Sequence, residues 1–579
     1  MVGEQTGQRV VVPKGPTARR QGTTRERWDD LRLPLPRWVE EIRPEQVRAV
    51  EQVVAEFARG CDVVQLDAPT GSGKTLIAEL VRREMKVERG LYVCTTKSLQ
   101  DQVLRDFEYA RVLKGRTNYI PTNLLSREVD GYRQGDRGAR GFGITCADCD
   151  AGPAGVPNDE KSCSYCEFVQ DCPYTRARSE AYVAPVGVLN TSYLLAECNG
   201  PGRFKGREVV VMDEADLIER ELLGYVEMRL PKKVVGELGV EVPKKGSHMT
   251  TIRAWLGEDV LPGLVDLRRR AASKGGLEGR REHARLDRLV DDVKRVIERE
   301  DGWVREGDEE DDRRGGTGNS LVLKPVTIED VAGRYLWRHG EKWLLMSGTT
   351  VSAEEQADAL GIEEAGLKWA SVEVPMLFRR ENRRVVYAPT ALMTRKGQEN
   401  GAVEKMGQGV VKVLARHPGV NVLVHCHSYA LAKEITRAVK VDGRAVITYT
   451  DARGRADALD AFKRAAGMGG AVMVASSMDR GIDLPGELCR VQVVCKMPFA
   501  SLGSRQVSER LRLPGGQTWY LMECVRTLMQ MAGRAVRSES DHAITYVLDE
   551  SFSKVLKDGK RMGMFPSWWL EALEFGRLT

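Results

Sequence analysis

The sequence lacks any run of about 18 consecutive apolar residues, so it predicts no transmembrane helix. Its first residues, MVGEQTGQRVVVPKGPTARRQGTTRER, are basic but contain no apolar segment of the kind that a secretory signal needs. We therefore expect residues 1–27 to form a disordered basic arm, and we expect the protein to be intracellular, in the cytoplasm or on the nucleoid.

A strong charge of either sign is also missing, because 88 Lys and Arg stand against 83 Asp and Glu, for a net charge of +5. This balance permits a polyanionic partner without requiring one, so any basic surface must be local. Outside the motifs described below we find no spare cluster of carboxylates or histidines, which argues against a nuclease. The length of 579 residues predicts several domains.

Histidines are few, and none of the seven lies between residues 146 and 172, where five of the twelve cysteines are gathered. The spacing there is C-x2-C-x13-C-x2-C-x5-C, and in a reducing compartment such a cluster favours metal binding over disulfides. Four thiolates suit an iron–sulfur cluster and structural zinc equally well. Because a small loop-rich segment has little core, the metal would supply its folding free energy. The candidate ligands are Cys163, Cys166 and Cys172 together with Cys146 or Cys149, with Cys146 preferred.

The strongest motif is VVQLDAPTGSGKTLIAEL, in which a short apolar strand at 63–67 leads into a Gly-rich loop and a helix at 76–86. This context is typical of a P-loop, although Ala68 replaces the first glycine. Its backbone N–H groups would surround phosphate at the positive end of the helix. Lys74 would reach the β- and γ-phosphates and Thr75 would ligate Mg²⁺. The expected nucleotide-binding residues of the loop are Thr70, Gly71, Ser72, Gly73, Lys74 and Thr75.

A second apolar strand, at 208–212, ends in the tetrapeptide Asp213-Glu-Ala-Asp216. At a strand end beside a P-loop, Asp213 suits Mg²⁺ binding, and Glu214 suits positioning or deprotonation of the attacking water. Further strands are predicted at about 91–94, before this segment, and at 343–347, 421–425 and 471–475 after it. The last of them leads to Gly481 and Asp483. The segment 530–537 is predicted to be helical, which would place Arg534 and Arg537 on one helix face.

The order of these motifs resembles that of superfamily 2 helicases, whose α/β fold has two RecA-like domains, each a parallel sheet flanked by helices, with ATP between them. The resemblance implies that Gln530, Arg534 and Arg537 act in catalysis, the two arginines as arginine fingers, and that Gly481 and Asp483 bind the nucleotide from the second domain. Upstream, Arg43-Pro-Glu-Gln46 resembles the motif on the adenine side of the site, which would make Gln46 a nucleotide-binding residue.

Two long gaps in the motif series predict inserted modules, since about 140 residues separate Lys74 from Asp213 and almost as many separate Asp213 from Ser347, whereas α/β loops usually take about 2–6 residues. This arrangement is similar to the XPD/DinG branch, with an iron–sulfur insertion before the acidic motif and a helical arch after it, here two helices at 251–272 and 279–300. Only the resemblance favours a [4Fe–4S] cluster over zinc. We expect a first RecA-like domain at 28–115, 181–230 and 325–352, interrupted by the cysteine-rich insertion at 116–180 and the arch at 231–324, and a second at 353–579.

The resulting expectation is an ATP-dependent DNA helicase that uses ATP and Mg²⁺, translocates on single-stranded DNA and unwinds forked or overhang duplexes as a monomer. The resemblance implies 5′→3′ movement. Arg176, Arg178, Tyr165 and Tyr174 are candidate strand contacts near the cysteines. A duplex translocase with a zinc module, and a binding protein without catalysis, remain alternatives, as does an RNA substrate.

Overall fold

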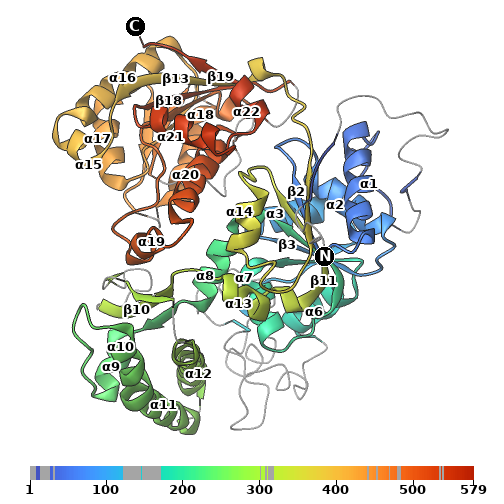
Figure 1. The fold of residues 1–579 in the computed structure, drawn as a ribbon, viewed down its shortest axis with the longest axis vertical. Coiled ribbons are helices and arrows are strands. Elements are labelled where there is room, and N and C mark those ends of the chain that lie inside the picture. Colours follow the sequence, from blue (N-terminus) through green and yellow to red (C-terminus); the bar gives the residue numbers. More distant parts are fainter. Residues whose placement is uncertain are drawn as a thin grey trace, which may run out of the picture.

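The computed structural model describes residues 8–12, 27–29, 33–120, 145–146, 171–274, 276–299, 302–306, 309–310, 319–439, 443–451, 454–467, 470–476, 478, 484, 486–533, 536 and 540–578. Within these residues, two parallel sheets form the cores of two α/β units, here called the first and second lobes. A smaller antiparallel sheet and its helices form the inserted module, residues 228–325 (Figure 1). The predicted fold class of two parallel α/β sheets is thereby confirmed.

The first lobe has its strands in the order β1-β12-β2-β11-β6-β3-β5-β4, all parallel. Almost every residue of the central strands is buried, as expected for a parallel sheet covered by helices on both faces. The strands are β1 (Gln8–Val11), β2 (Val63–Asp67), β3 (Gly90–Cys94), β4 (Ala110–Val112), β5 (Val186–Asn190), β6 (Arg207–Asp213), β11 (Gly340–Ser347) and β12 (Trp369–Glu373).

Helices on the two faces of this sheet bury separate apolar clusters, one containing Ile77 and Leu80 and the other containing Leu194 and Trp343. The carboxyl ends of β2 and β6 therefore lie at one edge of a rigid layer, where the next residues are the P-loop and Glu214. The helices are α1 (Pro44–Ala58), α2 (Lys74–Glu84), α3 (Lys97–Asp106), α6 (Pro173–Val183), α7 (Thr191–Asn199), α8 (Ile218–Val226), α13 (Glu329–Tyr335) and α14 (Ala353–Ala359).

The first lobe ends later than the expected boundary at residue 352. Strand β12 pairs in parallel with β2, with Trp369 opposite Val63 and Glu373 opposite Asp67. The first strand of the second sheet begins only at Arg383. The expected boundary is wrong because β12 has no motif of its own, and its place is set by pairing with a strand about 300 residues earlier.

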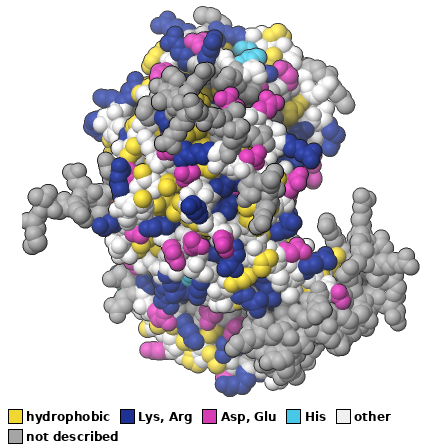
Figure 2. All heavy atoms as spheres, turned by 90° about the vertical axis from the view of Figure 1, so that its right-hand side faces the viewer, with side chains coloured by type: hydrophobic (Ala, Val, Ile, Leu, Met, Phe, Trp, Pro, Cys, Tyr) yellow, Lys and Arg dark blue, Asp and Glu magenta, His cyan; other side chains and the backbone are white. Residues whose placement is uncertain are grey.

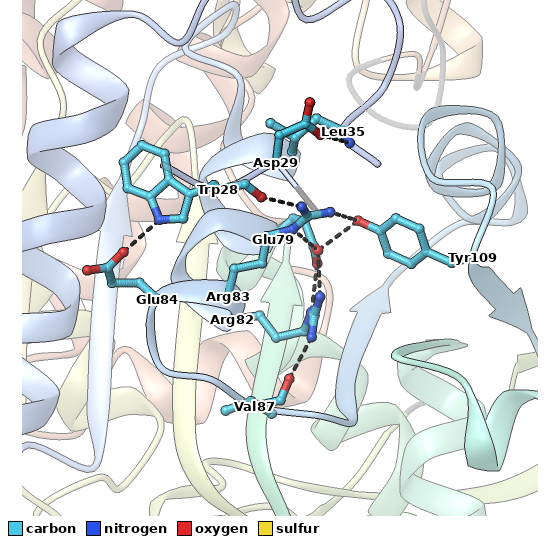
Figure 3. A network of polar contacts seen from close by, with 9 residues as sticks. All are labelled: Trp28, Asp29, Leu35, Glu79, Arg82, Arg83, Glu84, Val87 and Tyr109. Carbon is cyan, nitrogen blue, oxygen red and sulfur yellow. Dashed lines mark hydrogen bonds and ion pairs between the residues drawn. The ribbon is translucent and has the colours of Figure 1, made fainter. Parts of the chain in front are cut away.

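The N-terminal residues also differ from the expected disordered arm where the structure describes them. Gln8–Val11 form β1, which pairs with β12 at the edge of the sheet. Farther along, the Trp28 indole N–H donates to Glu84 at 2.6 Å, and the Trp28 carbonyl accepts a bond from Arg83 (Figure 3). Arg83 also binds Glu79, whose buried carboxylate joins Arg82 as well. This network fixes residues 27–29 onto the C-terminal half of α2, the helix that follows the P-loop.

The inserted module combines helices with a sheet that the sequence did not predict. Strand β10 pairs antiparallel with β7, β8 and β9. The first predicted helix is present as two α-helices joined by a π-helical turn, Leu256–Val260, just before Pro262. Three of the four strands have only two or three residues and are too short to show an alternating pattern. The elements are β7 (Met228–Leu230), α9 (Lys232–Leu238), α10 (Met249–Trp255), α11 (Leu261–Ser273), α12 (Gly276–Glu298), β8 (Trp303–Arg305), β9 (Glu309–Glu310) and β10 (Asn319–Pro325).

The second lobe is built on a parallel sheet with the order β15-β16-β14-β17-β18-β13-β19. Its strands are β13 (Arg383–Ala391), β14 (Val422–His425), β15 (Ala445–Thr448), β16 (Ala471–Ala475), β17 (Val491–Val494), β18 (Ala543–Asp549) and β19 (Leu573–Phe575). Its helices are α15 (Arg395–Glu399), α16 (Ala402–Arg416), α17 (Tyr429–Val439), α18 (Arg455–Ala466), α19 (Arg505–Arg510), α20 (Gly516–Ala532), α21 (Phe552–Arg561) and α22 (Ser567–Glu571).

Helix α19 joins the second lobe to both other units (Figure 1). The buried carboxylate of Glu306, at the end of β8, accepts bonds from the backbone N–H of Arg505 at 2.7 Å and from the hydroxyl of Ser504 at 3.0 Å. At the other end of the helix, Arg510 forms an ion pair with Glu219 of α8. The inserted module and the second lobe are therefore in direct polar contact.

Candidate nucleotide site and cysteine site

The P-loop joins β2 to α2 through two glycines in the left-handed region, Gly71 at φ 82° and Gly73 at φ 79°. Lys74 is the first residue of α2, and its Nζ donates to the carbonyl of Ala68 at 3.1 Å, across the loop. The N–H groups at the start of α2 and the Lys74 ammonium therefore face the same hollow. This arrangement attracts phosphate.

Two side chains from the N-terminal end of α1 fix the outer surface of the P-loop. Gln46, only 3% exposed, donates from Nε2 to the carbonyl of Ser72 at 2.9 Å and accepts from the backbone N–H of Arg43 at 3.0 Å. Arg43 donates from Nη2 to the carbonyl of Gly71 at 2.8 Å. Gln46 thus has both ends of its amide bound within the protein, and it braces the loop predicted to hold the phosphates.

The magnesium-binding residues predicted from the sequence lie beside each other through Tyr92 of β3. The Tyr92 hydroxyl donates to Asp213 Oδ2 at 2.8 Å and lies 3.4 Å from the Thr75 hydroxyl. Burial, and then the nearby Asp213 charge, raise the pKa of Tyr92 well above its ordinary value, so this phenol stays protonated. Carboxylate and hydroxyl oxygens are ligands that Mg²⁺ prefers, so Thr75 and Asp213 fit the role of holding that ion.

Glu214 has an unusual backbone conformation. Its φ is 53°, in the left-handed region that non-glycine residues seldom adopt, and its backbone N–H donates to Asp213 Oδ1 at 2.9 Å. The Thr95 hydroxyl donates to the Glu214 carboxylate. Residues in this strained conformation persist where the surroundings hold them, often at functional sites. The turn directs the carboxylate toward the loop after β3, in the same cleft as Lys74.

The second lobe contributes Gln530 to this cleft. Its Nε2 donates to Asp216 Oδ2 at 2.5 Å and to the Thr349 hydroxyl at 3.2 Å, while Ser347 donates to the other Asp216 oxygen at 2.9 Å. Helix α20 ends at Ala532, so the helix predicted for 530–537 is shorter than expected, because Gly533 follows. Arg534, Arg537, Gly481 and Asp483 lie outside the described residues.

The cleft between the lobes has a volume of about 690 Å³ and is lined by Lys74, Thr75, Asp213, Glu214 and Gln530, among others. The segment that links the lobes also faces it. Phe378 is only 5% exposed and lies directly on Gly71, where an added Cβ would come within 2.0 Å of the ring. The P-loop is therefore in contact with the connection between the two lobes.

Asp67, the last residue of β2, lies just before the P-loop. Burial raises its pKa to about 7, and the charge of Glu373, its partner on β12, adds to the increase, whereas Lys74 and Arg9 oppose it. Arg9 of β1 is paired with Glu373 at 2.6 Å. The edge of the sheet next to the nucleotide cleft therefore carries a carboxyl group that titrates near neutral pH.

Of the five predicted metal ligands, the structure describes Cys146 and Cys172 and brings them together. Cys146 is 4% exposed and its backbone N–H donates to Tyr119, while its thiol interacts with that of Cys172 at the start of α6. The contact with Cys146 and backbone N–H groups of the helix lower the pKa of Cys172 to about 5. This donor pair fits two of four thiolate ligands.

Cys149, Cys163 and Cys166 lie outside the described residues, among which no group of three or more potential metal ligands occurs. The choice between iron–sulfur and zinc therefore stays a prediction.

Two of the four predicted strand contacts are buried. Tyr174 is 3% exposed and Arg178 is 5% exposed, with the Arg178 guanidinium 5.5 Å from the Tyr174 ring centre. They stabilise the base of α6 and are unavailable to a strand in this conformation. Arg176 has a side chain that is 68% exposed, whereas Tyr165 lies outside the described residues. On the coloured part of the face in Figure 2, basic and acidic side chains alternate without one dominant basic patch.

Sequence reasoning missed two residues that line the cleft, Tyr92 and Phe378, and it also missed Thr95, which donates to Glu214. Tyr92 occupies a core strand and looks like any aromatic β-residue until the neighbouring strand places Asp213 beside its hydroxyl. Thr95 follows that strand in a polar loop, and this position was the available signal. Phe378 belongs to a linker without a motif, so only the fold reveals its contact.

Comparison with known proteins agrees with this geometry. Residues 410–572 match the model of the helicase C-terminal domain, and residues 40–133 match the model of the type III restriction enzyme res subunit. A solved XPD helicase structure superposes with a TM-score of 0.59 at 16% identity, covering 93% of this chain and all of that one. An apo XPD structure gives a TM-score of 0.55 at 15% identity and covers 88% of this chain and 98% of that one. These matches support the resemblance to XPD/DinG-type superfamily 2 helicases: two segments match domain models, and the fold is that of the solved XPD structures.

Two curated proteins that this chain resembles are named as helicases. A probable ATP-dependent helicase of Methanocaldococcus jannaschii is 25% identical over 263 residues, 41% of this chain and 38% of the relative. The ATP-dependent DNA helicase chl-1 of Caenorhabditis elegans is 32% identical over 108 residues, 17% of this chain and 13% of the relative. The match therefore spans less than two-fifths of either relative. No helix in the described part of the chain has the length and apolar character needed to cross a bilayer.

Proposed function

We propose that the protein hydrolyses ATP in the cleft between its lobes and uses the cycle to move along single-stranded DNA in the 5′→3′ direction and unwind duplex DNA. The observation that carries this proposal is the convergence of Lys74, Thr75, Asp213 and Glu214 from the first lobe with Gln530 from the second on one cleft. Phosphoryl transfer depends on positioning and charge stabilisation, and such a cleft provides both.

The roles divide between the lobes. Lys74 and the N–H groups at the start of α2 hold the phosphates, Thr75 and Asp213 hold Mg²⁺, and Glu214 orients the attacking water and takes its proton. Magnesium would neutralise charge on the phosphates. Gln530, Arg534 and Arg537 act from the second lobe. Gln530 binds Asp216, which lies two residues after Glu214, so it links the state of the first lobe to the position of the second.

The cysteine segment, in this proposal, holds a [4Fe–4S] cluster through Cys163, Cys166, Cys172 and Cys146. The adjacency of Cys146 and Cys172 supports this set because the two residues are 26 positions apart in sequence and yet lie side by side. Cluster ligation would fold the segment next to the base of α6. Iron and zinc analysis of anaerobically purified protein, with its visible spectrum, distinguishes the two metals. A colourless protein with stoichiometric zinc would refute the cluster and favour a zinc-containing translocase.

The decisive experiment replaces Lys74 with Ala, and Lys405 with Ala as a control, because Lys405 is an exposed lysine on α16 away from the cleft. Lys74→Ala should reduce ATP hydrolysis by more than about 100-fold while leaving single-strand binding largely intact, since it removes charge stabilisation of the transferred phosphate. Lys405→Ala should hydrolyse ATP normally. Wild-type hydrolysis by Lys74→Ala would refute the nucleotide site. Strand separation is measured on forked and 5′-overhang duplexes, and hydrolysis without separation would restrict the function to translocation.

A further inference from the structure

A second pocket lies where the inserted module meets the first lobe, apart from the nucleotide cleft. It has a volume of about 210 Å³, and its lining comes from the end of α8, the last turn of α12, the residue that opens β8, and α13. Three guanidinium groups, those of Arg295, Arg299 and Arg334, line it together with the rings of Trp303 and Tyr335. None of these residues belongs to a motif of the nucleotide site.

Cations and rings alternate around this pocket. Arg295 lies between two tyrosines, 5.5 Å from the centre of the Tyr225 ring and 5.6 Å from that of Tyr335. The Arg334 guanidinium lies 5.3 Å from the centre of the same Tyr335 ring, and the Arg299 guanidinium lies 5.9 Å from the centre of the Trp303 ring. Guanidinium planes held against rings present their edges to phosphate oxygens and leave ring faces for stacking.

The charges are arranged with the cations inside. Arg295 and Arg299 have side chains that are only 16% exposed, whereas the two carboxylates of the lining, Glu298 and Asp330, are each 57% exposed. Arg299 is paired with Asp330 at 2.7 Å, but Arg334 meets Glu298 only at 3.5 Å, and both of those side chains are exposed. The lining itself carries three arginines and two carboxylates, while Arg295 is also paired with Asp292 at 3.2 Å just outside the lining, so Arg334 has the weakest of the three acidic partners.

A buried donor in the same lining lacks an acceptor. Trp303 is 5% exposed, and its indole N–H has no hydrogen-bond partner among the described residues. An unsatisfied buried N–H costs about 1–3 kcal/mol, so such groups usually bind water or a ligand. Because the nitrogen itself is enclosed, an acceptor oxygen of a water or a ligand would have to enter beside the ring to satisfy it.

Two elements connect this pocket to the nucleotide cleft. Helix α8 begins two residues after Asp216, the residue bound by Gln530, and ends at Val226 in the pocket lining, a rise of about 13 Å over its length. Helix α13 ends at Tyr335 and leads into β11, which delivers Ser347 to Asp216. A ligand in the pocket would therefore contact the far ends of elements whose near ends form the cleft.

We propose that this pocket binds a phosphodiester segment of single-stranded nucleic acid, with the guanidinium groups on phosphate and Tyr335 or Trp303 available for a base. The inference rests on the proposed function for its partner, but strand binding does not require hydrolysis, so the two can fail separately. A strand is favoured over a small metabolite because the pocket is open at its exposed Arg334 and Glu298 side and mixes cations with rings, as single-strand grooves do.

The test uses the full chain and fluorescently labelled 20-nucleotide oligo(dT), with anisotropy measured without ATP over a series of salt concentrations. Arg334→Gln should weaken binding about 3- to 10-fold and reduce the slope of log K against log salt by about 0.7, the value for one phosphate contact on a single strand. Arg334→Lys should keep most of the slope. Trp303→Phe, which removes the N–H and keeps a ring, should weaken binding about 2- to 5-fold if the indole contacts the strand.

Arg269→Gln is the matched control, since Arg269 is also an exposed helical arginine with an acidic partner, Asp266, but lies on α11. It should bind like the wild type. If Arg334→Gln keeps the wild-type affinity and salt slope, the proposal is overturned. The proposal is also overturned if Arg334→Gln binds the strand normally and loses only the thermal stabilisation that inorganic pyrophosphate gives to the wild type. The pocket would then be a small-anion site. Loss of strand binding by Arg334→Gln in a protein that hydrolyses no ATP would support the pocket and refute the motor.

Discussion

Gln530 of the second lobe donates a 2.5 Å hydrogen bond to Asp216 of the first lobe, although 314 positions separate them in the sequence. The Asp216 carboxylate also accepts a hydrogen bond from Ser347. The end of β11 and the last turn of α20 therefore meet at the acid that follows β6. The other Gln530 amide atom, Oε1, is buried and has no partner among the described residues. One side chain thus connects the lobes and keeps an acceptor available at the cleft.

Gln530→Ala should lower the maximal rate of ATP hydrolysis about 10- to 100-fold while changing nucleotide affinity little, because the amide acts between the lobes and the P-loop holds the phosphates. Steady-state hydrolysis and fluorescent ADP binding measure the two effects. Gln398→Ala is a control, since that glutamine side chain donates to the Met393 carbonyl within its own segment. Equal losses in rate and affinity would show that Gln530 acts through nucleotide binding.

Gly71→Ala should reduce nucleotide affinity more than 10-fold, because a Cβ at this position would lie 2.0 Å from the Phe378 ring and φ is 82°. The left-handed conformation alone costs about 1–2 kcal/mol for a non-glycine residue. The double variant Gly71→Ala, Phe378→Ala removes the clash and should recover part of the affinity. No recovery would mean that backbone conformation dominates and that the contact with the linker matters little.

Asp67→Asn should flatten the dependence of stability on pH. The folded-state pKa of Asp67 is about 7 against an ordinary 3.8, so the folded protein binds this proton more tightly than the unfolded chain. Its contribution to stability is therefore complete below about pH 4 and is lost as pH rises to about 7, by at most about 4 kcal/mol. Thermal unfolding between pH 5 and pH 8 should show the wild type losing stability relative to the variant. If the stability of the wild type and that of the variant change with pH in parallel, the raised pKa of Asp67 is contradicted.

Glu306→Gln should weaken the contact between the inserted module and the second lobe, because the carboxylate accepts from Ser504, Arg505 and Gln506 at the start of α19. Loss of a buried charge that caps a helix costs about 1–3 kcal/mol. Hydrogen exchange should increase in residues 504–510 and in β10. Glu241→Gln, on the exposed part of the module, should leave exchange in both segments unchanged. Unaltered exchange in Glu306→Gln would show that the contact is not stabilising.

The fold class and the first-lobe half of the nucleotide site follow from the sequence because they depend on local chemistry. A buried strand, two glycines with positive φ and a lysine that begins a helix are all encoded within residues 63–75. Pairings between distant segments were less accessible. Nothing near residue 369 indicates that β12 would lie beside β2, and nothing near Glu306 shows that its carboxylate would meet α19.

Burial was the other quantity that local patterns could not supply. Tyr174 and Arg178 have the composition of a strand-binding surface, yet α6 presses both into the first lobe. Conversely, Arg295, Arg299 and Arg334 look in sequence like ordinary charges on amphipathic helices, and only the packing of α12 against α13 collects them around one pocket.

The late position of β12 has a practical consequence for dissecting the molecule. A fragment that stops at residue 352, where the motifs suggest a boundary, would leave the outer edge of β2 without its hydrogen-bonding neighbour and would remove the strand on which β1 lies. Open edges of this kind invite pairing between molecules and aggregation. An isolated first lobe that is meant to remain monodisperse should therefore retain the chain through Glu373.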